Sequence, residues 1–158
     1  MRIKKTILRK FIRALGRREE GGALVETALT APFLAVLILG SVEFARVAYA
    51  AIEVTNAARA GVSYGAQSGL TASDTAGITW AATHDGANIP GMTVTNVALG
   101  YICSDGSAST GATTDCSTSH IEETVTVQTQ VTMNPLIHVP GLPATYTLNG
   151  LAIQKCIQ

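Results

Sequence analysis

The segment RREEGGALVE, residues 17–26, and the apolar run 27–42 that follows it decide the fold of this chain. A basic leader ends at the glycine pair Gly21-Gly22, and one carboxylate, Glu26, lies near the start of an otherwise uncharged hydrophobic stretch. By insertion scales a carboxylate costs about 2.5–3.5 kcal/mol at the centre of a bilayer, and less near the end of a span. Ionisable groups inside membrane segments are functional candidates by default, so Glu26 is the first candidate in this sequence.

Charge is divided unevenly along the 158 residues, although the formal net charge is zero. Residues 1–20 carry eight Lys and Arg against two Glu, whereas residues 21–158 carry three basic and nine acidic side chains. A basic tail can indicate nucleic-acid binding, but this tail directly precedes a hydrophobic span, so the positive-inside rule explains it better. We therefore expect no nucleic-acid partner, a cytoplasmic N-terminus, and residues after about 45 on the other side of the membrane.

A single long helix is predicted over residues 22–66. The run 22–42 has the roughly 20 residues that a helix needs to cross the hydrocarbon core, and Pro32 inside it predicts a kink or local melting. Glu43 and Arg46 are three residues apart, so they can pair on one face of this helix. Beyond the span, small and apolar residues recur at spacings of three and four and predict a packing seam: Phe44, Val47, Ala51, Val54, Ala58, Gly61 and Gly65. The seam can pack against the chain's own sheet, against neighbouring subunits, or both.

Residues 67–158 predict a separate extracytoplasmic α+β domain. A short helix is expected over residues 73–84, capped by Ser73 or Asp74. Strands are expected over 92–102, 124–133 and 144–153, the last interrupted by a turn or bulge at Asn149-Gly150. The predicted architecture is α+β: a leader, residues 1–21, and a long pilin-like transmembrane helix packed on a small, mainly antiparallel sheet of about three strands.

Glu26 has two interpretations. In the first it is a lone carboxylate at the membrane interface of an ordinary single-pass anchor. In the second, cleavage between Gly21 and Gly22 removes the leader, and the new α-amino group, with an ordinary pKa of about 7.7–8.0, lies one helical turn from Glu26. When such helices pack side by side, the carboxylate of one subunit can neutralise the amine of its neighbour and fix the axial register. The agreement of leader, glycine, spacing and span favours the second.

Four motifs together resemble the TadE-like pseudopilin family of the tight-adherence (Tad/Flp) pilus, a branch of the type IV pilus systems. They are GGALVE at 21–26, APFL at 31–34, EFAR at 43–46 and TNAARAG at 55–61. The resemblance covers residues 17–66 and implies a subunit of the bacterial inner membrane that is cleaved after Gly21 by a prepilin peptidase. It further implies Glu26 as the assembly and processing carboxylate, other pilin subunits and the Tad assembly platform as partners, and roles in adhesion or biofilm formation. The family usually has an aromatic residue after the glutamate, whereas this chain has Thr27.

Cys103 and Cys116 bracket a loop rich in Gly, Ser and Thr. They are either two buried thiols or a disulfide, and the inferred compartment favours the disulfide. Cys156 could instead pair with either of them, because the last strand could lie beside the first. The three histidines show no metal-ligand spacing, and no nucleophile or phosphate-binding motif is present, so we predict no enzyme activity, no cofactor and no metal site.

Two functions of different classes remain. The leading prediction is a minor pilin or pseudopilin that assembles through the mature helix. The alternative is a secreted soluble binding domain released by signal peptidase after Ala50, because Ala48-Tyr49-Ala50 resembles an A-x-A cleavage site. Against the alternative, Glu43 and Arg46 lie just before this cut, the hydrophobic run exceeds the usual length, and the seam continues through the site.

Overall fold

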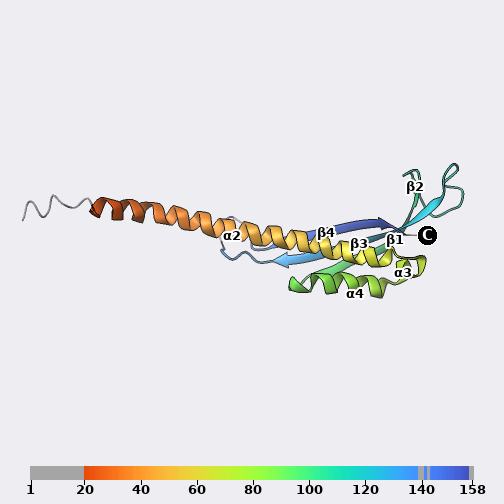
Figure 1. Ribbon diagram of the computed structural model, residues 1–158, viewed down its shortest axis with the longest axis horizontal. Helices are drawn as coiled ribbons and strands as arrows, with labels where there is room; N and C mark the ends of the chain where they lie inside the picture. Colours follow the sequence, from red (N-terminus) through yellow and green to blue (C-terminus); the bar gives the residue numbers. More distant parts are fainter. Residues whose placement is uncertain (1–19, 139–140, 142, 157–158) are drawn as a thin grey trace, which may run out of the picture. The chain divides into compact units, whose positions relative to one another are not determined.

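The computed structural model describes residues 20–138, 141 and 143–156, so the leader predicted over residues 1–21 lies almost wholly outside the described residues. The chain divides into two compact units, Met1–Phe44 and Ala45–Gln158, each of which is described by itself. The division falls inside the first described helix, α2 (Glu20–Gly65). Figure 1 shows α2 in red to yellow, and the strands in green to blue.

The part of α2 in the first unit forms from alanine, leucine and other good helix formers. The helix runs without interruption through Pro32, so the local melting expected there does not occur. Proline removes a single intrahelical donor, and the flanking residues keep the helix on both sides. Hydroxyl groups in this part are satisfied within the helix: Thr27 Oγ1 donates to the Ala23 carbonyl at 2.7 Å and Ser41 Oγ to the Leu37 carbonyl at 2.7 Å.

The helix expected over residues 73–84 is present within two residues and is capped by Asp74, and a further short helix that was not expected precedes it. In chain order the two are α3 (Gly69–Ser73) and α4 (Thr75–Asp85), followed by the 3-10 turn η1 (Gly86–Asn88). Ser68 caps α3 in a capping box with Thr71, and the Asp74 side chain accepts from the Gly77 N–H at 2.9 Å to cap α4. Each cap satisfies backbone donors at a helix start, which is why the chain begins a new helix at Thr75.

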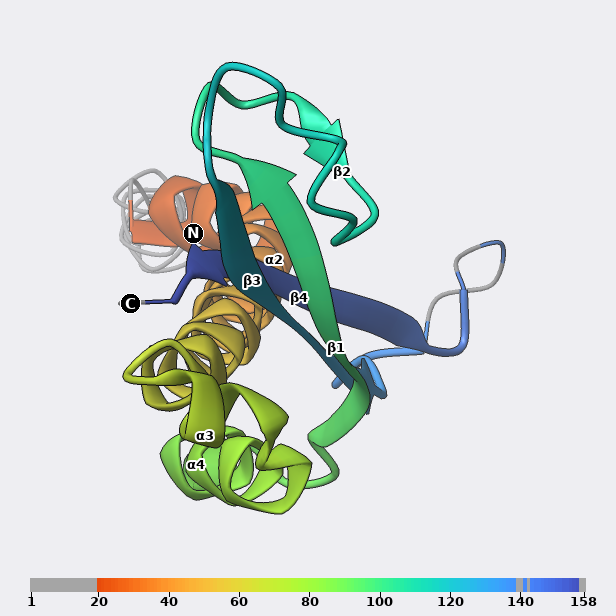
Figure 2. The same ribbon diagram turned by 90° about the vertical axis from the view of Figure 1, so that its right-hand side faces the viewer.

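The second unit also holds a four-stranded antiparallel sheet, which confirms the α+β class. Its strands are β1 (Thr93–Cys103), β2 (Ala108–Ser109), β3 (Ile121–Met133) and β4 (Tyr146–Lys155), in the order β2-β1-β3-β4. Figure 2 shows the sheet with α4 and the C-terminal part of α2 beside it. The two-residue strand β2 is the strand that the sequence did not predict. It pairs with Tyr101 and Ile102 at the end of β1.

Asn149-Gly150 is neither a turn nor a bulge, contrary to the expectation. Both residues lie in the regular ladder between β3 and β4, with Gly150 opposite Thr129. A Cβ on Gly150 would lie 2.4 Å from the Val54 carbonyl oxygen, and Thr129 Oγ1 donates to that same oxygen at 2.6 Å. Glycine is needed here because the α2 backbone approaches the sheet too closely for any side chain.

The core of the second unit lies between the helices and one face of the sheet. Alternate β3 residues point into it, among them Val125, Val127 and Val131, each at most 1% exposed. Gly61 lies against Ala82 and Val127, with both contacts of an added Cβ within 3.3 Å. The glycines of the predicted seam therefore serve packing within the chain.

The seam prediction was partly wrong at its N-terminal end. Phe44 is 76% exposed, and Val47 and Ala51 are only half-buried. The buried stripe of α2 is offset from the predicted one and is built from small residues, which allow close helix-to-sheet contact: Ala50, Val54, Ala57, Ala58, Gly61, Val62, Gly65 and Ala66.

Candidate assembly segment

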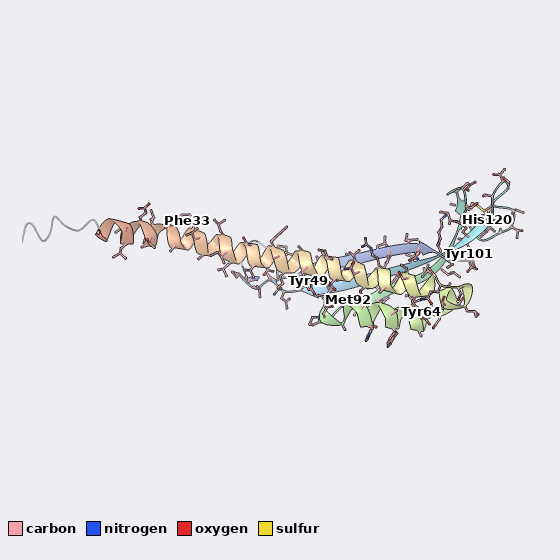
Figure 3. The ribbon with its side chains drawn as sticks, in the orientation of Figure 1. Phe33, Tyr49, Tyr64, Met92, Tyr101 and His120 are labelled. Carbon is pink, nitrogen blue, oxygen red and sulfur yellow. A yellow bond between two sulfur atoms is a disulfide. The ribbon has the colours of Figure 1, made fainter. Side chains whose placement is uncertain are left out.

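The first unit presents its large apolar side chains outward. Leu24, Leu29 and Phe33 are 72%, 71% and 69% exposed, and Phe33 is labelled in Figure 3. By length and composition, the residues Gly21–Gly65 form the one helix in the described part of the chain that is able to cross a membrane. None of its most apolar window is buried within the protein, so this window is not the core helix of a water-soluble fold. Such a surface needs lipid or neighbouring helices to cover it.

Glu26 lies on this apolar helix and is the single ionisable side chain between residues 21 and 42. Its side chain is exposed and makes no hydrogen bond or ion pair within residues 20–138, 141 and 143–156. Its backbone carbonyl accepts from Thr30 Oγ1 at 2.9 Å. Among the described residues the carboxylate is thus left available for a further partner, whereas the Thr30 hydroxyl is satisfied by the helix itself.

Gly21 and Gly22 lie at the start of α2, where an added Cβ would meet nothing within 4 Å. The fold itself therefore does not require glycine at either position. A requirement for glycine there would have to come from an external partner, such as the active site of a peptidase.

Arg46 connects α2 to the segment after β3, because its Nη2 donates to the Asn134 carbonyl. This contact was not predicted, since no local pattern links residues so distant in sequence. The expected pairing of Glu43 with Arg46 stays a prediction.

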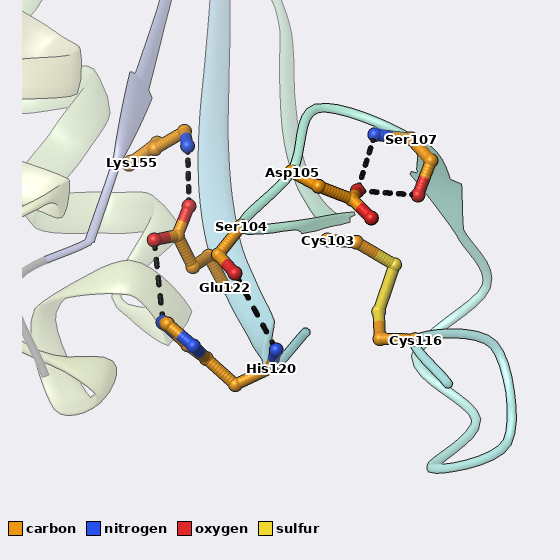
Figure 4. Close-up of polar contacts among 8 residues, drawn as sticks. All are labelled: Cys103, Ser104, Asp105, Ser107, Cys116, His120, Glu122 and Lys155. Atoms are coloured by element: carbon orange, nitrogen blue, oxygen red, sulfur yellow. Dashed lines mark hydrogen bonds and ion pairs between the residues drawn. A yellow bond between two sulfur atoms is a disulfide. The ribbon is translucent and has the colours of Figure 1, made fainter. Parts of the chain in front are cut away.

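The predicted disulfide is present: Cys103 and Cys116 are joined with a Cα–Cα distance of 5.6 Å (Figure 4). Cys156 is a free, buried cysteine, and burial, followed by the charge of Glu123, raises the pKa of its thiol. The expectation that the last strand lies beside the first was wrong, because β3 separates β4 from β1. Two strand spacings, about 9–10 Å, exceed the Cα separation that a disulfide can bridge, so Cys156 cannot pair with Cys103.

Two aspartates organise the loop that this disulfide closes. Asp105 accepts from the Ser107 N–H and hydroxyl at 2.9 and 2.6 Å, and Asp115 accepts from the Thr110 N–H and hydroxyl, each at 2.7 Å. These hydrogen bonds, led by those from the Ser107 and Thr110 side chains, hold the pKa of both carboxyl groups below the usual value. Sequence reasoning did not single out either residue, although Asp105-Gly106 is a turn signal.

The base of the loop carries a small charge network, also shown in Figure 4. Glu122 forms an ion pair with Lys155 and lies 3.5 Å from His120 Nε2. The hydrogen bond from Lys155 is the main cause that lowers the pKa of Glu122. Among the described residues, no three His, Cys, Asp or Glu side chains are grouped so as to hold a metal ion.

Residues 21–63 match the family described as TadE-like protein. This segment is TadE-like. The match begins at Gly21, includes Gly22, Glu26, Pro32, Glu43 and Arg46, and ends two residues before α2 does. It confirms the resemblance seen in the sequence and makes the chain similar to pilin-like proteins associated with the Tad pilus. No curated protein and no solved structure matches the chain significantly.

Proposed function

We propose that this chain is a minor pilin or pseudopilin that acts in the assembly of a Tad/Flp-type pilus. The observation that carries the proposal is the coincidence of three features in one segment. The TadE-like match, the outward-facing apolar span and Glu26, which has no side-chain partner among the described residues, all lie within residues 21–63. A structural protein that assembles through its helix needs all three, whereas a water-soluble binding domain needs none of them.

In this proposal a prepilin peptidase cleaves the chain between Gly21 and Gly22, and the basic leader stays in the cytoplasm. The mature helix anchors the subunit in the inner membrane by a single pass, with the second unit on the periplasmic side. Glu26 then pairs with the α-amino group of a neighbouring subunit, because pairing lowers the cost of both charges in the membrane. Membrane lipid, other pilin subunits and the Tad assembly platform are the remaining partners, and adhesion or biofilm formation is the expected outcome.

The surroundings of Ala50 are relevant to the alternative function, in which signal peptidase releases a soluble domain by cleavage after Ala50. Ala50 lies inside α2, is 1% exposed, and belongs to the same core cluster as Val54 and Val131. Cleavage after Ala50 would remove this core contact together with Arg46, which bonds the Asn134 carbonyl. This favours retention of the segment N-terminal to Ala51.

Substitution of Glu26 tests the proposed function. We expect Glu26→Ala and Glu26→Leu to keep membrane insertion, since both remove a charge from the span, but to abolish most piliation in the native host. The matched control is Thr30→Val, one turn further along, which removes a hydroxyl that bonds only its own helix. Carbonate washing reports insertion, and electron microscopy of sheared pili reports assembly. Normal piliation with either Glu26 variant would overturn the role of this carboxylate.

A further inference from the structure

Two sets of hydroxyl groups can be distinguished in the loop 104–119, apart from Ser104 and Ser119 at its N-terminal and C-terminal limits. Ser107 bonds Asp105, and Ser109 and Thr110 bond Asp115, so these three side chains hold the loop in shape. The disulfide at Cys116 and the short strand β2, which pairs with the end of β1, also hold this loop.

The second set, which we call the free hydroxyl set, consists of Thr113, Thr114, Ser117 and Thr118. All four side chains are exposed, and none makes a hydrogen bond within the part of the chain that the structure describes. They lie within six consecutive residues on both sides of Cys116, which is anchored by its disulfide. Other contacts therefore hold the loop in its conformation, and the four exposed hydroxyl groups take no part in those contacts.

This differs from the hydroxyls of the helices. Thr27, Thr30, Thr55, Thr79 and Thr83 each donate to the carbonyl four residues earlier. A hydroxyl engaged in this way has its proton directed at the backbone, and the adjacent helix restricts access to its oxygen. The free hydroxyl set has neither restriction.

Asp115 is the one charged side chain within residues 113–118, and the residues just before the set are small. The neighbours of the set in sequence include Gly111 and Ala112, and the nearest acidic side chain, Asp115, is directed to Thr110. Neither Lys nor Arg occurs between Arg59 and Lys155. All four hydroxyl groups are exposed, so an enzyme that modifies an alcohol can reach them, and a high content of exposed Ser and Thr is one feature of O-glycosylated segments.

We propose that the free hydroxyl set is an acceptor site for O-glycosylation. The hydroxyl oxygen attacks the anomeric carbon of a sugar that is activated through a diphosphate. A glycosidic C–O bond forms, and the bond between the anomeric carbon and the diphosphate oxygen breaks, so that the diphosphate leaves with the electron pair. The hydroxyl proton passes to a base of the transferase, and the step needs no oxidant or reductant. The proposal uses the exported location of the second unit but not its role in assembly.

Peptide masses of the full-length protein from its native host test the proposal. After reduction, cleavage on the carboxyl side of Asp and Glu releases residues 106–115 and 116–122, which separate Thr113 and Thr114 from Ser117 and Thr118. We expect one or both peptides to carry the added mass of a hexose, deoxyhexose or N-acetylhexosamine residue. Unmodified masses for both peptides would overturn the proposal, and so would an added phosphate or acyl group in place of a sugar.

Two matched variants locate the modification. A quadruple variant, Thr113→Val, Thr114→Val, Ser117→Ala and Thr118→Val, should lose all added mass. A control with Ser107→Ala and Thr110→Val removes two hydroxyl groups that bond the loop aspartates, and this control should keep the added mass. Added mass that persists in the quadruple variant, or that disappears in the control alone, contradicts the assignment. The readout is independent of cleavage after Gly21, so failure here and failure of the proposed function are distinguishable.

Discussion

The first unit and the second unit differ in the exposure and size of their apolar side chains. Between residues 24 and 42 the large apolar side chains are exposed, from 48% at Leu39 to 72% at Leu24. From Ala50 onward the same helix has a buried stripe of mostly small residues, although Ile52 on its other side is 59% exposed. Large side chains suit contact with lipid or neighbouring helices, and small ones allow the α2 backbone to approach the sheet. This difference supports the proposal that the start of the helix associates with partners outside the chain, whereas its end packs within the second unit.

Glycine substitution should give the largest contrast between the two regions. Gly150→Val places a side chain where the Val54 carbonyl lies 2.4 Å from an added Cβ, and we expect it to destabilise the second unit by about 3 kcal/mol or more. Gly40→Val, where an added Cβ meets nothing within 4 Å, should leave unfolding of the second unit unchanged. Thermal unfolding of the full chain in detergent, followed by Trp80 fluorescence, measures both. Equal midpoints for the two variants would break the comparison.

Loss of the disulfide should cause the next largest decrease in the stability of the second unit. Cys103→Ser together with Cys116→Ser opens a loop with a sequence separation of 13, and the chain-entropy model gives a cost of about 3 kcal/mol. Denaturant titration in detergent measures the loss, with Cys156→Ala as a control that leaves the disulfide intact. Unchanged stability in the double variant would mean that the loop contributes nothing to the second unit.

Replacing a valine by alanine should also destabilise the protein in the second unit and not in the first, but by a smaller free energy. Val127 is 0% exposed, so Val127→Ala should cost about 2 kcal/mol from lost burial and an incomplete collapse of the cavity. Val36 is 70% exposed, so Val36→Ala should leave the unfolding midpoint of the second unit unchanged. A comparable loss in both variants would show that the first unit contributes to the core of the second.

Acid should have a smaller effect, confined to the second unit. Hydrogen bonds from the Gly77 N–H and from the Tyr64 hydroxyl hold the pKa of Asp74 below its usual value. A carboxyl with a lowered folded pKa contributes stability above the unfolded value of about 3.9, and loses it as the pH falls through the folded pKa. Asp74→Asn should therefore narrow the difference between unfolding midpoints at pH 5 and pH 2.5. An unchanged difference would remove Asp74 from the acid response.

The sequence predicted the elements whose signals are local. The helix expected over 22–66 is α2, and the strands expected over 92–102, 124–133 and 144–153 match β1, β3 and β4 within a few residues. The short elements α3 and β2 were missed because they depend on caps and on pairing with Tyr101 and Ile102. The role of Gly150 was predicted wrongly because Asn-Gly is a turn signal. Glycine is needed there because the carbonyl of Val54, far away in the chain, leaves no room for a Cβ.

The candidate site was predictable to a different extent. Glu26, Gly21 and Gly22 could be found because charge, glycine and hydrophobicity are read along the chain, and the TadE-like match covers all three. The contact of Arg46 with Asn134 and the two loop aspartates could not, since they depend on how distant segments meet in the fold. In the proposed assembly the partner of Glu26 belongs to another chain, which one sequence does not describe.

The N-terminal sequence of the mature protein, purified from its native host, tests the central claim most directly. Cleavage after Gly21 predicts a chain that begins Gly22-Ala23-Leu24. A chain that begins at Ala51 would make this a secreted domain, and an intact Met1 would leave an unprocessed single-pass anchor. Either of these results would contradict the proposed pilin-type assembly through Gly22 and Glu26.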